Sequence, residues 1–199
     1  MLRRSISLVL RAALSTCLST SLHAVSPVST AGVTDVHGHP IAGLAPYGTR
    51  VVVLFFAASD CPISNRYTPE IARLASEFAS RGVTVWRVFP NPGDTAQVVR
   101  AHDEQFHSGN NALIDTRQIL VKMAHATITP EAAVFVLSAS GFHKTYQGRI
   151  DDRYIAFGQE RPQAMHHELE QAIRAALDGK AIPKPGGPPI GCSIVTRKP

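Results

Sequence analysis

Cys61 is the residue of this sequence whose position and neighbours most favour chemistry. It follows the apolar run 50–57 and precedes Pro62 and a helical pattern, which predicts a helix beginning beside it. A helix N-terminus offers unpaired N–H groups and a partial positive charge, and both favour a thiolate over a thiol. A free cysteine is more often a small buried hydrophobe, but the polar residues at 59–60 and 64–66 argue against burial. The sequence therefore predicts a reactive thiol at position 61.

Cys192 is the candidate partner of Cys61. Cys17 is the only other cysteine, and it falls in an N-terminal leader, so an exported chain would keep two. A distant second cysteine can convert a sulfenic acid or a mixed disulfide into a stable disulfide. A structural staple and a free cysteine in a mobile tail are the alternatives, and the sequence does not choose between them.

The elements that must position these cysteines alternate between strands and helices. A short hairpin is expected at 34–44. The order that follows is a strand at 50–57, a helix from Pro62 that ends at Gly82, a strand at 83–89, a helix at 95–106, a strand at 112–114, a short helix at 118–125, a hairpin of 132–137 and 142–149, and a last helix at 165–177. This alternation predicts an α/β fold with a central mixed sheet and helices on both faces.

Two segments resemble the thioredoxin superfamily. Residues 51–64 (VVVLFFAASDCPIS) are similar to its strand and active-site loop. They most resemble the redoxin branch, which includes the alkyl hydroperoxide reductase/thiol-specific antioxidant (peroxiredoxin-like) proteins and periplasmic thiol–disulfide oxidoreductases. Thr129-Pro130 is similar to the cis-proline that faces the reactive cysteine of that fold. The resemblance covers roughly 34–177 and implies a thioredoxin-like fold in which Pro130 presents backbone to a substrate.

The sequence also departs from these relatives. Ser64 stands where a dithiol thioredoxin has its second cysteine, so Cys61 cannot form the usual short-loop disulfide. Ala58 and Leu54 replace the threonine and the proline of a typical peroxiredoxin, and Asn65 replaces the second cysteine of copper-carrying relatives of the Sco type. A mechanism with a single cysteine or with two distant cysteines remains.

Other candidate residues lie beside the cysteine and the proline. The candidates for substrate contact are Pro62, Ser64, Arg66 and Thr129. Arg66 could polarise a substrate oxygen, although a solvated position on the helix surface is the alternative. Arg149 is expected to approach Cys61 as a positive charge. The nine histidines form no HExxH or similar spacing, so neither a metal site nor a cofactor is predicted.

The chain is expected to divide into four parts. Residues 1–24 have a basic start, a weakly apolar stretch and a small-residue cleavage site, which predict a signal peptide and export to the periplasm. A transit peptide would look similar, and membrane attachment is expected only if Cys17 is lipidated. Residues 25–33 are a linker and 34–178 the thioredoxin-like domain. Residues 179–199 form a tail rich in Pro and Gly, for which no regular structure is expected.

The net charge of +5 does not indicate a nucleic-acid partner. The leader contributes three arginines and no acid, which leaves 17 basic against 15 acidic residues in the rest of the chain. These are scattered apart from the last residues, whereas nucleic-acid binding needs a concentrated basic surface.

These observations predict an extracytoplasmic thiol-dependent oxidoreductase. Cys61 would attack a disulfide or a peroxide, Cys192 would resolve the product, and an unknown thiol would donate electrons. The alternatives are a non-catalytic protein that binds copper or tethers a partner through Cys61, and a thioredoxin scaffold with an inert cysteine.

Overall fold

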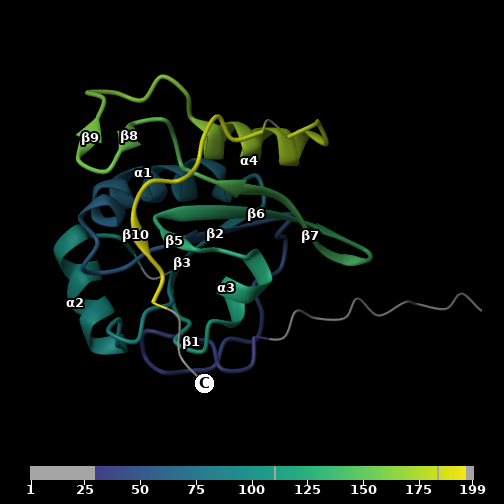
Figure 1. Ribbon diagram of the computed structural model, residues 1–199. Helices are drawn as coiled ribbons and strands as arrows, with labels where there is room; N and C mark the ends of the chain where they lie inside the picture. The colour runs from purple at the N-terminus through teal and green to yellow at the C-terminus, as the bar shows by residue number, and fades with distance from the viewer. Residues whose placement is uncertain (1–29, 110, 183, 196–199) are drawn as a thin grey trace, which may run out of the picture.

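The computed structural model describes residues 30–109, 111–182 and 184–195, and within them a six-stranded mixed sheet forms the centre of the fold (Figure 1). Its strands are β1 (Thr34–Asp35), β2 (Val51–Phe56), β3 (Val83–Phe89), β4 (Ala112–Ile114), β6 (Glu131–Ser138) and β7 (Gly141–Gly148). Their spatial order is β1-β4-β3-β2-β6-β7. Strands β2, β3 and β4 run parallel, and the other three pair antiparallel with their neighbours. The predicted α/β class and mixed sheet are confirmed.

Helices cover both faces of the sheet. They are α1 (Pro62–Ala79), α2 (Ala96–Phe106), α3 (Ile119–Ala124) and α4 (Glu168–Asp178). In Figure 1, α1 and α4 lie together on one side of the sheet and α3 lies on the other. Ion pairs join α1 to α4, because Arg73 of α1 contacts Glu170 at 2.5 Å and Arg174 of α4 contacts Glu77.

Strand β2 lies in the middle of the sheet and explains the apolar run in the sequence. Val53 and Phe55 join the apolar cluster that α1 and α4 cover, whereas Leu54 and Phe56 join the cluster that α3 covers. Successive side chains of a strand point to opposite faces, so a strand covered on both sides must be apolar at every position. The carboxyl end of this rigid strand leads directly into the loop that carries Cys61.

Four short strands were not predicted. β8 (Tyr154–Ala156) and β9 (Gln159–Glu160) form a small hairpin, and β5 (Ile128–Thr129) pairs antiparallel with β10 (Cys192–Ser193). The expectation that the tail has no regular structure is therefore wrong at 192–193. Figure 1 shows the tail, in yellow, passing from α4 across the molecule to lie beside β5. The tail sequence has no strand pattern of its own, and it forms a strand here because it pairs with the edge of β5.

The last described residues of the tail belong to the core. Ile194 is buried in the cluster on the α3 side of the sheet, and its N–H donates to the carbonyl oxygen of Thr127 at 3.0 Å. The backbone of Val195 is held by the side chains of Asn91 and Gln118 at 2.9 and 2.6 Å. The segment that carries Cys192 is therefore fixed to the domain.

The predicted leader, with Cys17, and most of the predicted linker lie outside the described residues. Val33, at the end of the linker, is buried in the core. None of the helices in the described part of the chain is both long and apolar enough to cross a membrane.

Replacing Ile194 by Ala tests whether the tail is part of the folded domain. We expect Ile194→Ala to lower the free energy of unfolding by about 2–5 kcal/mol, the usual cost of removing a buried Ile side chain. Val195→Ala is the matched control, because the Val195 side chain is 56% exposed and its loss should change stability by less than about 0.5 kcal/mol. Urea unfolding measures both. Equal stabilities for the two variants would show that the tail is not anchored.

Candidate active site

Cys61 is the N-cap residue of α1, as the sequence predicted. Its backbone is extended (φ −89°, ψ 110°), and Pro62 occupies the first turn, where the missing N–H of proline has no consequence. The thiol is fully buried, with 0% of the residue exposed. The expectation that polar neighbours would keep it exposed is wrong, because several of those neighbours are bonded within the protein and the C-terminal strand covers the sulfur.

The loop before β6 faces the sulfur of Cys61. The Thr129–Pro130 peptide bond is cis, as the resemblance implied. The thiol of Cys61 donates to the carbonyl oxygen of Thr129 at 3.3 Å, and both residues are buried. Thr129 also donates its hydroxyl to the carbonyl oxygen of Cys192 at 3.3 Å. The residue before the proline therefore contacts both cysteines.

Cys192 lies directly against Cys61. The two sulfur atoms are 2.8 Å apart and are not bonded, against about 2.05 Å in a disulfide. The pairing of β10 with β5 places Cys192 opposite Thr129. The structure thus brings together two cysteines separated by 131 positions, which the sequence could not establish.

Gly191 permits this close approach. A Cβ atom at position 191 would lie 2.1 Å from the carbonyl oxygen of Thr129 and 2.8 Å from Pro130. Real Cβ atoms do not approach other heavy atoms so closely, and here the obstacle is backbone that cannot rotate away. Only glycine therefore allows the tail to pass over the Pro130 loop and place Cys192 at Cys61.

The two thiols differ in acidity. Burial by itself raises the pKa of Cys61, but the thiol of Cys192 and the nearby N–H and hydroxyl of Ser64 favour the thiolate and outweigh burial, so the pKa lies below its ordinary value. The Ser64 hydroxyl is buried and has no hydrogen-bond partner among the described residues. Burial, the hydrogen bond to Cys61 and the negative charges of Cys61 and Asp60 raise the pKa of Cys192 to about 12. The first proton that the pair loses therefore leaves Cys61.

A buried polar network supports the loop before Cys61. The carboxylate of Asp94 accepts from the N–H of Ser59 at 3.0 Å and from its hydroxyl at 2.5 Å. Asn65 donates its amide to the carbonyl oxygen of Ser59 at 3.0 Å, which leaves its Oδ1 to accept from Nε2 of His102 at 2.8 Å. Burial raises the pKa of Asp94. Ser59 is thus held at every polar atom, which fixes the start of α1.

Sequence reasoning missed Asp94 and His102. A signal for Asp94 was present, because it follows the predicted strand 83–89 and the carboxyl ends of neighbouring parallel strands meet at one edge of the sheet. His102 carried no such signal, since it lies inside a helix and its role depends on the packing of α2 beside α1.

The predicted site residues are only partly assembled. Pro62, Ser64, Thr129 and Pro130 surround the cysteine pair. Arg66 is exposed and lies 3.8 Å from Glu160 of the β8–β9 hairpin. The expected approach of Arg149 to Cys61 is not seen, because its guanidinium binds Glu168 beneath Gly186 and Gly187. The sequence offered no sign that a carboxylate of α4 would capture this arginine.

A cavity of about 300 Å³ opens beside the cysteine pair. It is lined by Pro62, Ile63, Tyr154, Phe157, Gly158, Glu160 and Cys192. Most of these side chains are apolar, and Phe157 is 76% exposed at its rim. The β8–β9 hairpin therefore forms one wall of the approach to Cys192.

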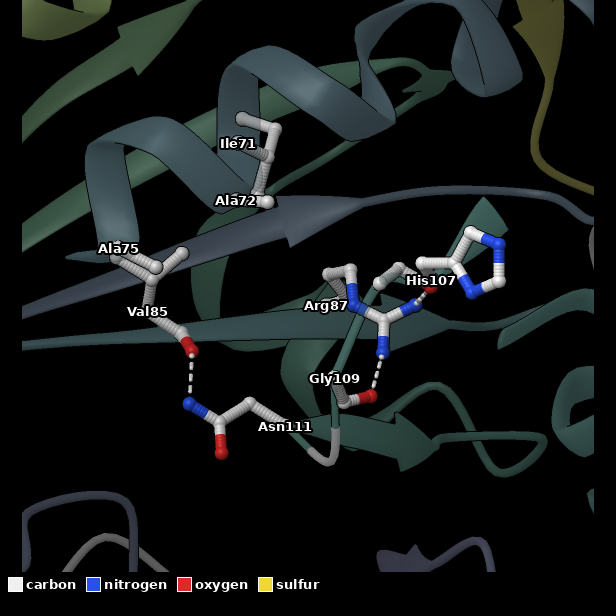
Figure 2. Close-up of a pocket in the computed structure, with 9 residues that line it drawn as sticks. Ile71, Ala72, Ala75, Val85, Arg87, His107, Gly109 and Asn111 are labelled. Atoms are coloured by element: carbon white, nitrogen blue, oxygen red, sulfur yellow. Dashed lines mark hydrogen bonds between the residues drawn. The ribbon is translucent and has the colours of Figure 1, made fainter. Parts of the chain in front are cut away.

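A second cavity, of about 260 Å³, lies beneath α1 and is not lined by either cysteine (Figure 2). Arg87 lines it, but its guanidinium is bound to Asp103, to the Ser108 hydroxyl and to the Gly109 carbonyl oxygen. Asn111 donates its amide to the carbonyl oxygen of Val85. The side chains of Arg87 and Asn111 are thus bonded within the fold.

No group of three or more His, Cys, Asp or Glu side chains in the described ranges is arranged to hold a metal ion. The copper-binding alternative therefore gains no third ligand near the two cysteines from the residues that the structure describes.

The topology and the placement of Cys61 opposite Pro130 put the protein in the thioredoxin-like class. Residues 28–142, more than half of the chain, match the AhpC/TSA family. The chain belongs to this family, as the sequence resemblance implied. A comparison with curated proteins finds no match.

Solved structures share the fold at low sequence identity. An uncharacterised conserved protein from Geobacillus kaustophilus is similar with a TM-score of 0.68 and 22% identity, over 88% of this chain and 94% of that one. A hypothetical protein from Sinorhizobium meliloti 1021 has a TM-score of 0.67 and 23% identity, over 86% and 94%. An exposed lipoprotein thioredoxin from Streptococcus pneumoniae strain TIGR4 has a TM-score of 0.50 and 20% identity, over 74% and 96%.

Gly191→Ala tests whether the C-terminal strand positions Cys192. We expect this variant to form the Cys61–Cys192 disulfide much more slowly than the wild type, because the added Cβ displaces the tail from Thr129. Gly43→Ala is the control, since position 43 has open space and no positive φ. Mass spectrometry after timed oxidation and alkylation measures the rate. Equal rates for both variants would contradict the assigned role of Gly191.

Proposed function

We propose that this protein is an extracytoplasmic thiol–disulfide oxidoreductase whose redox pair is Cys61 and Cys192. The observation that carries the proposal is the 2.8 Å contact between the two sulfur atoms, one of them at a helix N-terminus. The lowered pKa of Cys61 and the raised pKa of Cys192 support the proposal. Disulfide exchange needs one cysteine that reacts as a thiolate and a second cysteine that reacts in the next step.

The proposed reaction moves two electrons. One sulfur of the pair attacks a substrate disulfide and displaces the first substrate thiolate, which forms a mixed disulfide. The other sulfur then displaces the second substrate thiolate, so the substrate leaves as two thiols and the protein holds a Cys61–Cys192 disulfide. The reverse sequence oxidises a dithiol. An external thiol or disulfide, according to direction, restores the starting state.

A disulfide is favoured over a peroxide as the substrate. Ala58 and Leu54 occupy the positions at which a typical peroxiredoxin has its threonine and its proline, and both are buried apolar side chains. They offer no side-chain hydrogen bond to polarise a peroxide. Peroxide reduction through a sulfenic acid is the alternative reaction for the same pair.

Export fits this chemistry. The leader at 1–24 has the order of a secretory signal, and a disulfide formed by the pair would persist in an oxidising compartment such as the periplasm.

The test is exchange between oxidised glutathione and a small dithiol, catalysed by the mature protein. We expect the wild type to form the internal disulfide and to accelerate the exchange. Cys61→Ser and Cys192→Ser should each lose most of the activity, because neither retains a second sulfur with which to complete the exchange. Ser193→Ala, next to Cys192 and exposed, is the control that should stay active. Full activity in either cysteine variant would refute the two-cysteine mechanism.

A further inference from the structure

The two sulfurs of the pair are not equally accessible. Cys61 is 0% exposed, with Thr129 and Cys192 against its sulfur. Cys192 is partly exposed and lines the cavity beside the β8–β9 hairpin, whereas Cys61 is not among the residues that line it. An incoming sulfur that enters this cavity therefore meets Cys192 first.

We propose that Cys192 is the sulfur that exchanges with the substrate, and that Cys61 makes and breaks the internal disulfide. This order is the reverse of the one expected from the sequence, in which Cys61 attacks the substrate and Cys192 resolves. The proposal rests on the proposed function, because it requires the two cysteines to form a redox pair.

The exchange begins from the internal disulfide, which an external disulfide such as oxidised glutathione produces. A substrate thiolate attacks Cys192 Sγ, the bond to Cys61 Sγ breaks, and the bonding electron pair leaves on Cys61. A second substrate thiol then loses its proton to solvent and attacks the substrate sulfur of the mixed disulfide. Cys192 leaves and takes up a proton. Two electrons pass from the substrate dithiol to the protein.

The environment of Cys61 suits the leaving role. The N–H and hydroxyl of Ser64 lie near its sulfur at the start of α1, and both favour the negative charge that arrives when the bond breaks. A thiol of lower pKa leaves faster in disulfide exchange. Ser64 is one cause of the lowered pKa of Cys61, and it still lies beside Cys61 when Cys192 carries the substrate. Attack at Cys192 therefore expels the better leaving group.

The tail is anchored to the domain both before and after Cys192. Ile194 is buried beyond Cys192, and before it Pro185 packs on Gly148. These anchors hold Cys192 in place while its sulfur alternates between Cys61 and a substrate. Access to Cys61 by a substrate would instead require the strand to leave β5.

The experiment uses the complete mature protein in its oxidised form, with reduced glutathione as the probe. The reaction is stopped with acid at short times, and peptide mass spectrometry locates the glutathione adduct. We expect several-fold more adduct on Cys192 than on Cys61. Equal labelling, or more adduct on Cys61, would overturn the proposal.

Two further measurements separate this proposal from the proposed function. The same reaction in urea should label both cysteines similarly, because unfolding removes the difference in access. If Cys192 were still labelled preferentially in urea, the selectivity would not come from the folded structure. If the reduced protein never forms an internal disulfide with oxidised glutathione, the proposed function itself fails. If the disulfide forms but glutathione attaches to Cys61, only the order of exchange is wrong.

Discussion

The antiparallel pairing of β10 with β5 is the contact on which the candidate site depends. It sets Cys192 opposite Thr129, whose carbonyl oxygen also faces the sulfur of Cys61. Two strands of two residues each are too short to hold together by their own hydrogen bonds. Their pairing therefore relies on the burial of Ile194 and on the close fit that Gly191 allows. Without this pairing, Cys61 would have no second cysteine beside it, and the C-terminal strand would not cover its sulfur.

The main sheet fixes the other side of the contact. Glu131, the first residue of β6, is buried, and its carboxylate accepts from the N–H groups of Thr127 and Ile128 at 2.9 and 3.4 Å. Gln147 of β7 donates to the same carboxylate at 2.9 Å. The β5 strand is thereby tied to the sheet that also carries β2 and the loop of Cys61. Both sulfurs are positioned by the same rigid element, which suits a pair that must meet in one geometry.

The sequence predicted the parts of the fold that local pattern determines. The apolar run at 50–57 predicted a strand buried on both faces, and Cys61 followed by Pro62 predicted a helix start. The cis bond before Pro130 came from resemblance to a family, since propensity favours trans. The position of Cys192 could not be predicted, because glycines and prolines in a tail normally indicate irregular chain. Gly191 is required because any larger residue would meet the backbone of Thr129. The sequence alone shows a glycine in the tail, but not the backbone that lies against it.

The reduction potential of the Cys61–Cys192 pair tests most directly whether the contact is a redox centre, and equilibration with glutathione buffers measures it. Stabilisation of the Cys61 thiolate favours the reduced state and makes the disulfide more oxidising. We therefore expect a potential above about −300 mV, the level below which structural disulfides usually lie. A potential below about −300 mV would contradict the account, because it would mark the pair as a structural staple.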